Sequence, residues 1–269
     1  MNKKNKEKVV ILLSVGAVCI GVMVSNLRVG YGYTKNYKDF RNETLSNTTI
    51  TEIMYNTSQE ITKGPGKSSG KVAYITIDDG PSKYTDKIIE ILDKYNAKGT
   101  FFMIDKNMKN YPNQVKNVIE SGNSAGFHSV SHDIHKLYKN NISAKEEFDI
   151  NKKTFYDITG QSSNLVRLPY GSKPYTPLES YRTLVNGEYK VWDWNIDTED
   201  WKSDSDQIVA NVKNYSSNED DIVVLMHEKK QTVEALEEVL KYLSNEGYNL
   251  LPINQNQNPQ NFWLDNLYK

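Results

Sequence analysis

The hydrophobic positions of the chain follow two patterns that alternate from Lys71 onward. Apolar residues at helical spacing predict amphipathic helices around 88–95, 112–120, 143–159 and 233–243. Short apolar runs between them predict buried strands at 72–77, 100–103, 165–167, 189–194, 222–226 and 248–251. Alternation of this kind predicts an α/β fold with a mostly parallel sheet, either open or closed into a barrel.

Local signals mark the ends of two of these helices. Ser143 followed by Glu146 predicts a capping box at the start of helix 143–159. Gly247 is expected to end the late helix. After Asn254 the chain is rich in Asn and Gln, and we expect this tail to be peripheral.

Residues 1–28 carry a different pattern, in which lysines precede an uninterrupted apolar run. The lysines lie within 1–8, the run spans 9–25, and Arg28 follows it. The length suits a short membrane helix, and the small-residue pattern for signal cleavage is weak. We therefore expect an uncleaved transmembrane signal anchor, with a cleaved signal and a secreted product as the alternative. The lysines place the N-terminus in the cytoplasm and the rest of the chain outside the cell membrane.

The segment after this predicted anchor is polar and ends in a stretch rich in Gly, Pro and Ser. That composition predicts a stalk or linker. The sequence thus divides into an anchor at 1–28, a stalk at 29–70, an α/β domain at 71–254 and a C-terminal tail at 255–269.

Composition narrows the classes of function. Hydrophobic residues make up 38% of the chain, which is too apolar for wholesale disorder. A formal net charge of −1 argues against nucleic acid as a partner, because such binders need a basic face. The sole cysteine, Cys19, lies in the predicted anchor, so thiol chemistry is excluded beyond it. No protein partner can be read from the sequence.

Polar residues at the ends of the predicted strands are candidates for catalysis, because parallel α/β folds place active sites there. The first strand ends in Asp78-Asp79, and adjacent carboxylates repel each other unless a cation neutralises one. His128 and His132, at i and i+4, would share one face of a helical turn, which suits one divalent metal. Two His and one Asp would leave positions open for water and substrate. Zinc is the favoured ion, and other divalent first-row metals would fit.

Three further polar groups follow predicted strands. Arg167 could orient a carboxylate through paired hydrogen bonds, the segment 197–201 carries two aspartates, and His227 ends the strand at 222–226. Each alone is compatible with an ion pair, a helix cap or a core histidine. Together, at the strand ends of one α/β unit, they indicate a single active site.

With these residues in place, the chain resembles the polysaccharide deacetylase family, also called the NodB homology or carbohydrate esterase 4 group. The five ordered motifs of the family match 76–80, 128–132, 167–171, 197–201 and 225–227. The resemblance covers about 71–254. It implies a distorted (β/α) barrel of parallel strands, preceded here by the anchor and stalk.

The resemblance also implies a role for each matching residue in the first half of the site. Asp79, His128 and His132 would hold one divalent metal ion, with Zn²⁺ favoured and Co²⁺, Ni²⁺ or Mn²⁺ as alternatives. Asp78 would be the general base, and Arg167 would tether it.

The remaining motifs would complete the reaction. The backbone N–H of Tyr170 would stabilise the oxyanion, and His227 would be the general acid, oriented by Asp200. Trp201 and Leu225 would wall the pocket for the acetyl methyl group.

Four residues depart from the family pattern. Ile77 replaces a common Phe and Leu168 a common Pro, and two more lie beside proposed reacting groups. Phe127 stands where a polar residue is frequent, and Glu228 stands where Asp is usual. We expect these positions to influence substrate preference or the metal.

The resemblance and the predicted compartment indicate a membrane-anchored enzyme that removes N-acetyl groups from an extracytoplasmic polysaccharide. Cell-wall peptidoglycan is favoured, at N-acetylglucosamine or N-acetylmuramic acid, and the family then implies lysozyme resistance. Alternatives are deacetylation of poly-N-acetylglucosamine, chitin oligomers or acetylated xylan. Two further classes remain, namely a non-catalytic carbohydrate-binding surface protein and another metallohydrolase such as a phosphatase.

Overall fold

A computed structural model describes residues 70–217 and 219–267 of the 269-residue chain. The predicted anchor at 1–28, and the predicted stalk except Gly70, lie outside the described residues. Within those ranges, no helix is long and apolar enough to cross a membrane.

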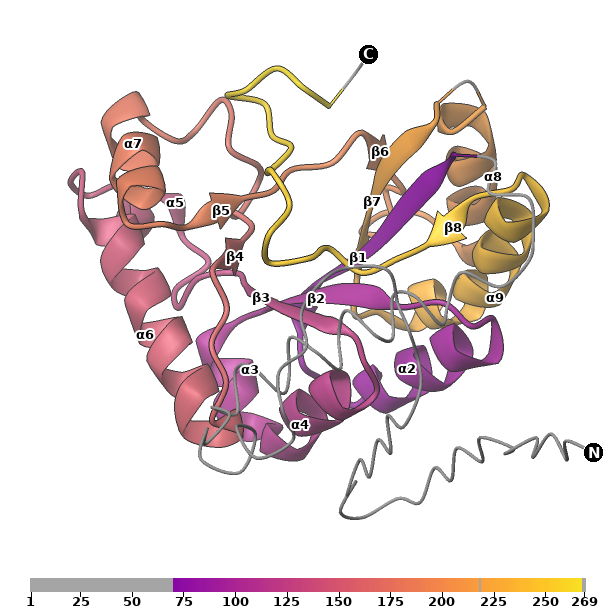
Figure 1. The fold of residues 1–269 in the computed structure, drawn as a ribbon, viewed down its shortest axis with the longest axis horizontal. Helices are drawn as coiled ribbons and strands as arrows, with labels where there is room; N and C mark the ends of the chain where they lie inside the picture. Colours follow the sequence, from indigo (N-terminus) through magenta and orange to yellow (C-terminus); the bar gives the residue numbers. More distant parts are fainter. Residues whose placement is uncertain (1–69, 218, 268–269) are drawn as a thin grey trace, which may run out of the picture. The chain divides into compact units, whose positions relative to one another are not determined.

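Parallel strands form one eight-stranded sheet at the centre of the described domain (Figure 1). Its order is β5-β4-β3-β2-β1-β7-β6, and β8 also pairs with β1. Every pairing is parallel, which confirms the parallel sheet expected from the sequence. The strands are β1 (Val72–Gly80), β2 (Gly99–Met103), β3 (Ser124–Phe127), β4 (Leu165–Val166), β5 (Lys190–Val191), β6 (Ile196–Asp197), β7 (Asp221–His227) and β8 (Asn249–Leu250).

Helices cover the outer face of this sheet, from α6 and α7 on one side of Figure 1 to α8 and α9 on the other. The helices predicted around 88–95, 112–120, 143–159 and 233–243 are all present, whereas α3, α5, α7 and α8 lie in segments for which no helix was predicted. The described helices are α2 (Thr85–Lys94), α3 (Asp105–Asn110), α4 (Pro112–Glu120), α5 (Ile134–Leu137), α6 (Ser143–Thr159), α7 (Leu178–Asn186), α8 (Ser205–Tyr215) and α9 (Lys230–Asn245).

The capping box predicted for α6 is wrong. Ile142, not Ser143, is the N-cap residue, and it has no side chain that could cap. Asn140 takes that task instead, because its Oδ1 accepts from the N–H groups of Ile142 at 2.9 Å and Ser143 at 3.0 Å.

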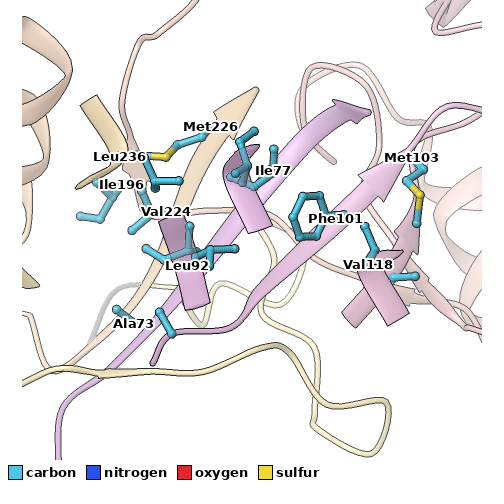
Figure 2. Close-up of a cluster of buried hydrophobic side chains, with 14 of the residues drawn as sticks. Ala73, Ile77, Leu92, Phe101, Met103, Val118, Ile196, Val224, Met226 and Leu236 are labelled. Carbon is cyan, nitrogen blue, oxygen red and sulfur yellow. The ribbon is translucent and has the colours of Figure 1, made fainter. Parts of the chain in front are cut away.

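Alternation along β1 separates the core from the site. Ala73, Ile75 and Ile77 are fully buried in the cluster beneath the helices, part of which Figure 2 shows. Since successive side chains of a strand point to opposite faces, Tyr74 and Asp78 lie on the other face. Tyr74 packs there in a second buried cluster, and Asp78 ends the same row.

The tail after Asn254 is not peripheral, contrary to our expectation. We call residues 254–267 the C-terminal strap. Its Asn261 is fully buried and donates from Nδ2 to the carbonyl of Val191 in β5 at 2.9 Å. Its Leu267 is buried with Tyr74, and the Leu267 carbonyl accepts from Asn195 Nδ2, just before β6, at 3.1 Å. The strap therefore joins the two edge strands across the inner face of the sheet.

Candidate active site

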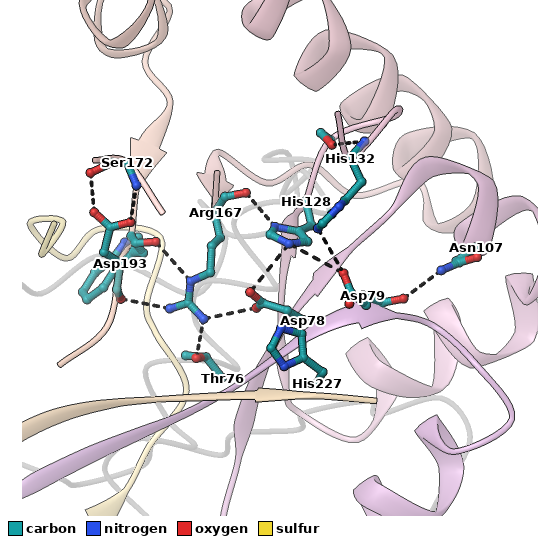
Figure 3. Close-up of polar contacts among 12 residues, drawn as sticks. Thr76, Asp78, Asp79, Asn107, His128, His132, Arg167, Ser172, Asp193 and His227 are labelled. Atoms are coloured by element: carbon teal, nitrogen blue, oxygen red, sulfur yellow. Dashed lines mark hydrogen bonds and ion pairs between the residues drawn. The ribbon is translucent and has the colours of Figure 1, made fainter. Parts of the chain in front are cut away.

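Asp78 and His227 lie side by side at the ends of adjacent strands. They are register partners in the pairing of β1 with β7, so their side chains leave the sheet on the same face. Asp78 is 2% exposed. Its Oδ1 accepts from Nη1 of Arg167 at 3.1 Å, which leaves Oδ2 facing His128 (Figure 3).

Arg167 is held so that it cannot swing away from Asp78. The side chain is fully buried just after β4, and its Nε donates to the carbonyl of Trp192 at 3.1 Å. Its Nη2 donates to the carbonyl of Asp193 at 3.0 Å, and Nη1 also donates to the hydroxyl of Thr76. A guanidinium with its donors used in this way acts as a fixed positive charge beside the carboxylate.

A bulge turns Asp79 toward the same site. In a regular strand the side chain after Asp78 would point to the opposite face. The register between β1 and β2 shifts at Asp79, whose φ is 68°. Positive φ is uncommon for a residue with a side chain, and here it re-aims a carboxylate at the strand end. Asn107 supports the turn, because its Nδ2 donates to the carbonyl of Asp79 at 2.7 Å.

The two histidines meet in a loop rather than on the helical turn that their spacing predicted. His128 follows β3, and His132 lies before α5. Ser129 and His132 have φ values of 72° and 49°, and the hydroxyl of Ser129 accepts from the N–H of His132 at 3.0 Å. Glu147 of α6 accepts from the N–H of Val130 at 2.9 Å and of Ser131 at 2.8 Å. These contacts shape the loop that presents His132.

Asp79, His128 and His132 form a group that fits a metal ion. One ligand atom from each lies within 4.8 Å of the others. The distance from Asp79 Oδ1 to Nε2 of His128 is 3.7 Å, and that to Nε2 of His132 is 3.5 Å. The buried Asp79 Oδ1 has no hydrogen-bond partner within the described residues. Orphaned buried oxygens are rare, and a cation would satisfy this one.

The tautomer of His128 supports the same assignment. Its Nδ1 lies 2.8 Å from the carbonyl of Arg167, and because a carbonyl only accepts, Nδ1 carries the proton. Nε2 is then a bare lone pair that faces the group (Figure 3). Burial lowers the pKa of His128, which favours the neutral imidazole that metals bind. One carboxylate and two imidazoles suit a divalent first-row metal, zinc included.

His227 and Asp200 form a second polar group of the site. We call it the Asp200–His227 corner, and the metal-binding group the Asp79–His128–His132 corner. Nδ1 of His227 donates to Asp200 Oδ1 at 2.7 Å, and the His227 N–H donates to Oδ2 at 2.7 Å. Thr232 of α9 donates to Oδ2 at 2.6 Å. Burial by itself lowers the pKa of His227, but the hydrogen bond and charge of Asp200 outweigh it and raise that pKa overall. The imidazolium form is therefore favoured.

Tyr170 lies in a turn beside His132. Its φ is 65°, and its ring meets the His132 ring edge-on at 5.2 Å between centroids. In the part of the chain that the structure describes, the Tyr170 N–H has no acceptor. Trp201 is 59% exposed and Leu225 is buried in β7, and their predicted role as pocket walls stays a prediction.

Sequence reasoning missed the residues that support the site from behind. Asn107 and Glu147 act on backbone groups of other elements, and nothing in the local sequence marks them. Asp193 is different, because it interrupts an apolar run predicted as a strand at 189–194. A charged residue inside such a run is a signal that it has a buried partner.

Comparisons with known proteins agree with this geometry. The family model for polysaccharide deacetylase matches residues 65–185. A peptidoglycan-N-acetylglucosamine deacetylase of Bacillus cereus is 32% identical over 275 residues, covering 98% of this chain and 97% of the relative. The peptidoglycan-N-acetylmuramic acid deacetylase PdaC of Bacillus subtilis is 31% identical and covers 69% of this chain, but only 38% of PdaC is matched.

A solved structure shares the fold. The crystal structure of a polysaccharide deacetylase from Bacillus cereus superposes with a TM-score of 0.70 at 38% identity. The match covers 73% of this chain and 99% of that one.

Proposed function

The chain belongs to the polysaccharide deacetylase family, and from this premise we propose that it hydrolyses the N-acetyl groups of N-acetylglucosamine in peptidoglycan. The observation that carries the proposal is the pairing of Asp78 with His227 beside the Asp79–His128–His132 group. A base, an acid and a metal-binding group within one strand-end cluster are what amide hydrolysis needs. The names of the relatives support peptidoglycan as the polymer.

A divalent metal ion would be held by Asp79, His128 and His132. When bound, such an ion polarises a carbonyl and makes water more acidic. The orphaned Asp79 oxygen and the bare Nε2 of His128 support this assignment.

Asp78 would act as the general base. Its Oδ1 is engaged by Arg167, so Oδ2 is the oxygen that takes the proton from the attacking water. The water oxygen bonds to the acetamide carbon as that proton moves. Arg167 keeps the carboxylate oriented throughout, because its other hydrogen bonds fix it to the backbone.

Tyr170 and His227 would act on the two sides of the tetrahedral intermediate. The free N–H of Tyr170 donates to the oxyanion. Because Nδ1 of His227 is bonded to Asp200, Nε2 is the nitrogen that gives its proton to the leaving amine. The C–N bond then breaks, and acetate and a free amino sugar are released.

Acetate release by the full-length protein tests the proposal. The substrates are purified peptidoglycan, N-acetylglucosamine oligomers and poly-N-acetylglucosamine, each with Zn²⁺ and with chelator. We expect release that needs the metal and that Asp78→Asn abolishes. No release from any of the three by folded, metal-loaded protein would refute the proposal. Release from the free polymers alone would reassign the substrate.

The sugar is identified by analysing the digested wall. Treated peptidoglycan is hydrolysed with muramidase, and the fragments are weighed by mass spectrometry. Loss of acetyl from N-acetylglucosamine is expected. Loss from N-acetylmuramic acid would instead place the activity with that of PdaC.

We further propose that residues 1–28 anchor the protein in the cell membrane with the domain outside. The support is the lysine-flanked apolar run at 9–25. The full-length protein should fractionate with membranes and be degraded by protease added to intact protoplasts. Full-length protein in the cytosolic fraction, or protected from protease, would contradict this location.

A further inference from the structure

We propose that Asp193, together with the C-terminal strap, positions the Tyr170 N–H for oxyanion stabilisation. The inference deepens the proposed deacetylase function and rests on it. It makes residues beyond the last family motif part of the framework of the active site.

We call residues 170–172 the Tyr170 turn. The side chain of Asp193 connects this turn to the strap. The residue is fully buried. Its Oδ1 accepts from the N–H of Ser172 at 2.8 Å, and its Oδ2 accepts from the Ser172 hydroxyl. Oδ2 also accepts from the N–H of Phe262 in the strap at 2.8 Å. One carboxylate therefore holds the residue two positions after Tyr170 and the strap at the same time.

The backbone of Asp193 reaches the other half of the site. Its carbonyl accepts from Nη2 of Arg167 at 3.0 Å, and Arg167 holds the base Asp78 (Figure 3). Its N–H donates to the carbonyl of Gln260 in the strap at 2.9 Å. Asp193 thus contacts both the turn that carries the Tyr170 N–H and the arginine that holds the proposed general base, Asp78.

Trp263 of the strap holds the same turn from a second side. Its Nε1 donates to the carbonyl of Ser172 at 3.0 Å. The indole stacks on Tyr181 of α7 at 5.5 Å between centroids and 25° between planes. Both backbone groups of Ser172 are consequently fixed, the N–H by Asp193 and the carbonyl by Trp263.

Gly171 shows how closely the strap approaches. A Cβ at this position would lie 3.1 Å from Phe262 and 3.2 Å from Trp194, and the φ of Gly171 is 85°. The turn therefore has almost no room to shift toward the strap. Asn261 keeps the strap in place, since its buried Oδ1 accepts from the N–H groups of Trp263 and Leu264 at 3.0 Å each.

The chemistry of the site explains why a turn would be held this firmly. An oxyanion donor works only when it is fixed at the right distance before charge develops. Tyr170 itself is exposed and has an unfavourable φ, so it cannot hold its own N–H in place. A buried carboxylate is costly, and burial raises the pKa of Asp193. A strap that only covered the sheet could use apolar contacts instead.

Asp193→Asn in the full-length protein is the central test, because it keeps the shape but replaces one acceptor oxygen by a donor. Removing an oxyanion donor costs roughly 10²- to 10³-fold in kcat, so displacing one should cost about tenfold. KM should stay within about twofold, because the contact forms only as charge develops. Zn²⁺ content should be unchanged. Trp263→Phe, which removes one donor to the turn, should show the same pattern more weakly.

Tyr248→Phe is the stability control. Its hydroxyl donates to the carbonyl of Ser216 at 2.9 Å, beside the start of β8 and therefore far from the catalytic strand ends. Leu264→Ala is the control within the strap, because this side chain is 49% exposed. Both should keep wild-type kcat. An equal loss of kcat in Asp193→Asn and Tyr248→Phe, at equal loss of Tm, would overturn the proposal.

A second substrate separates positioning from general damage. A trifluoroacetyl group gives a less basic oxyanion, which needs less hydrogen-bond stabilisation. The defect of Asp193→Asn should therefore be smaller on an N-trifluoroacetyl sugar oligomer than on the N-acetyl one. Equal defects on both substrates would contradict the inference.

Failure of the proposed function can be told apart from failure of this inference. If wild-type protein releases acetate and Asp193→Asn matches it, the inference alone is wrong. If wild-type protein releases none, the proposed function is wrong. In that case amide hydrogen exchange at 170–172 decides the structural part. Unchanged exchange in Asp193→Asn would refute the positioning.

Discussion

The two corners of the active site differ in how far their polar groups satisfy one another. At the Asp200–His227 corner every contact is a short hydrogen bond, between 2.6 and 2.7 Å, including the one from Thr232. At the Asp79–His128–His132 corner the facing atoms are 3.5 to 3.7 Å apart, and Asp79 Oδ1 has no partner in the described residues. The polar atoms around Asp200 satisfy one another, whereas the Asp79–His128–His132 group leaves a buried oxygen that a cation would satisfy.

This difference does not come from weaker support behind the second corner. Asn107 holds the carbonyl of Asp79, and Glu147 holds the loop that carries His132. The carbonyl of Arg167 fixes the ring of His128. The protein thus orders three side chains that do not bond to one another, an arrangement that suits a preformed metal site.

Asp79→Asn should have the largest effect, because it alters the group that lacks a partner for its buried oxygen. The substitution keeps the shape but removes the charge that a cation would neutralise, so kcat/KM should fall by about 10³-fold or more. Added Zn²⁺ should raise the Tm of the wild type, because binding to the folded state stabilises it. This rise should disappear in the variant. Calorimetry with and without Zn²⁺ measures this rise. An equal rise in Tm for wild type and variant would contradict the metal assignment.

Asp200→Asn changes the partner of His227 and should lower kcat/KM by roughly 10²-fold. It should leave Zn²⁺ affinity unchanged. Asp200 raises the pKa of His227 against the effect of burial, so without that charge the pKa falls. A general acid must be protonated, and the alkaline limb of the kcat/KM profile should move to lower pH. A limb that stays in place would remove His227 as the acid.

The same raised pKa links stability to pH. A group with a folded pKa above its unfolded value, here 6.5, contributes stability below that value and loses it as pH rises through the folded pKa. The Tm advantage of wild type over Asp200→Asn should therefore shrink as pH rises above about 6.5. A difference that is constant or grows with pH would show that His227 does not carry the extra proton.

Glu147→Gln tests the support of the metal corner. The N–H groups of Val130 and Ser131 both donate to Oε2 of Glu147, and the Ser131 hydroxyl donates to Oε1. Gln keeps one acceptor oxygen for the N–H groups but loses the negative charge and the acceptor for the hydroxyl, so the loop of His132 should loosen. Loss of such an outer contact typically costs 10- to 100-fold in metal affinity, and about tenfold is expected here. Excess Zn²⁺ should restore activity, as titration of acetate release would show. A defect that no metal concentration relieves would place Glu147 in folding instead.

Thr232→Val should have the smallest effect. It removes one of the donors to Asp200 Oδ2 while keeping the volume, and a hydrogen bond to a charged group contributes about 1.5 to 3 kcal/mol. We expect a lower Tm and a loss of kcat/KM of about threefold, since His227 still holds both oxygens of Asp200. A loss as large as that of Asp200→Asn would mean that the corner depends on α9 rather than on the pair itself.

Particular residues show how far the sequence reaches. Asp78, Arg167 and His227 were expected at strand ends, and the structure brings them together there. His128 and His132 do face one ion site, but the helical turn inferred from their spacing is absent. Their loop depends on Glu147, a partner 16 and 17 positions away, which no local pattern reveals. The strap was expected to be peripheral because its Asn- and Gln-rich composition resembles a solvated tail, whereas its Asn261 and Leu267 are buried.

The amino-acid pattern alone predicted the parallel α/β architecture, the family and the candidate site residues that the structure brings together. Hydrophobic periodicity and motif spacing are written along the chain itself, so they can be read without knowing which elements pack together. The bulge that turns Asp79 beside Asp78 becomes visible only in the folded chain, as do the hydrogen bonds from Asp193 and Trp263 to Ser172 beside Tyr170. The bond from Trp263 to Ser172 spans 91 positions, and that from Phe262 to Asp193 spans 69. Such contacts depend on which elements become neighbours when the sheet forms, and a pattern along the chain does not record that.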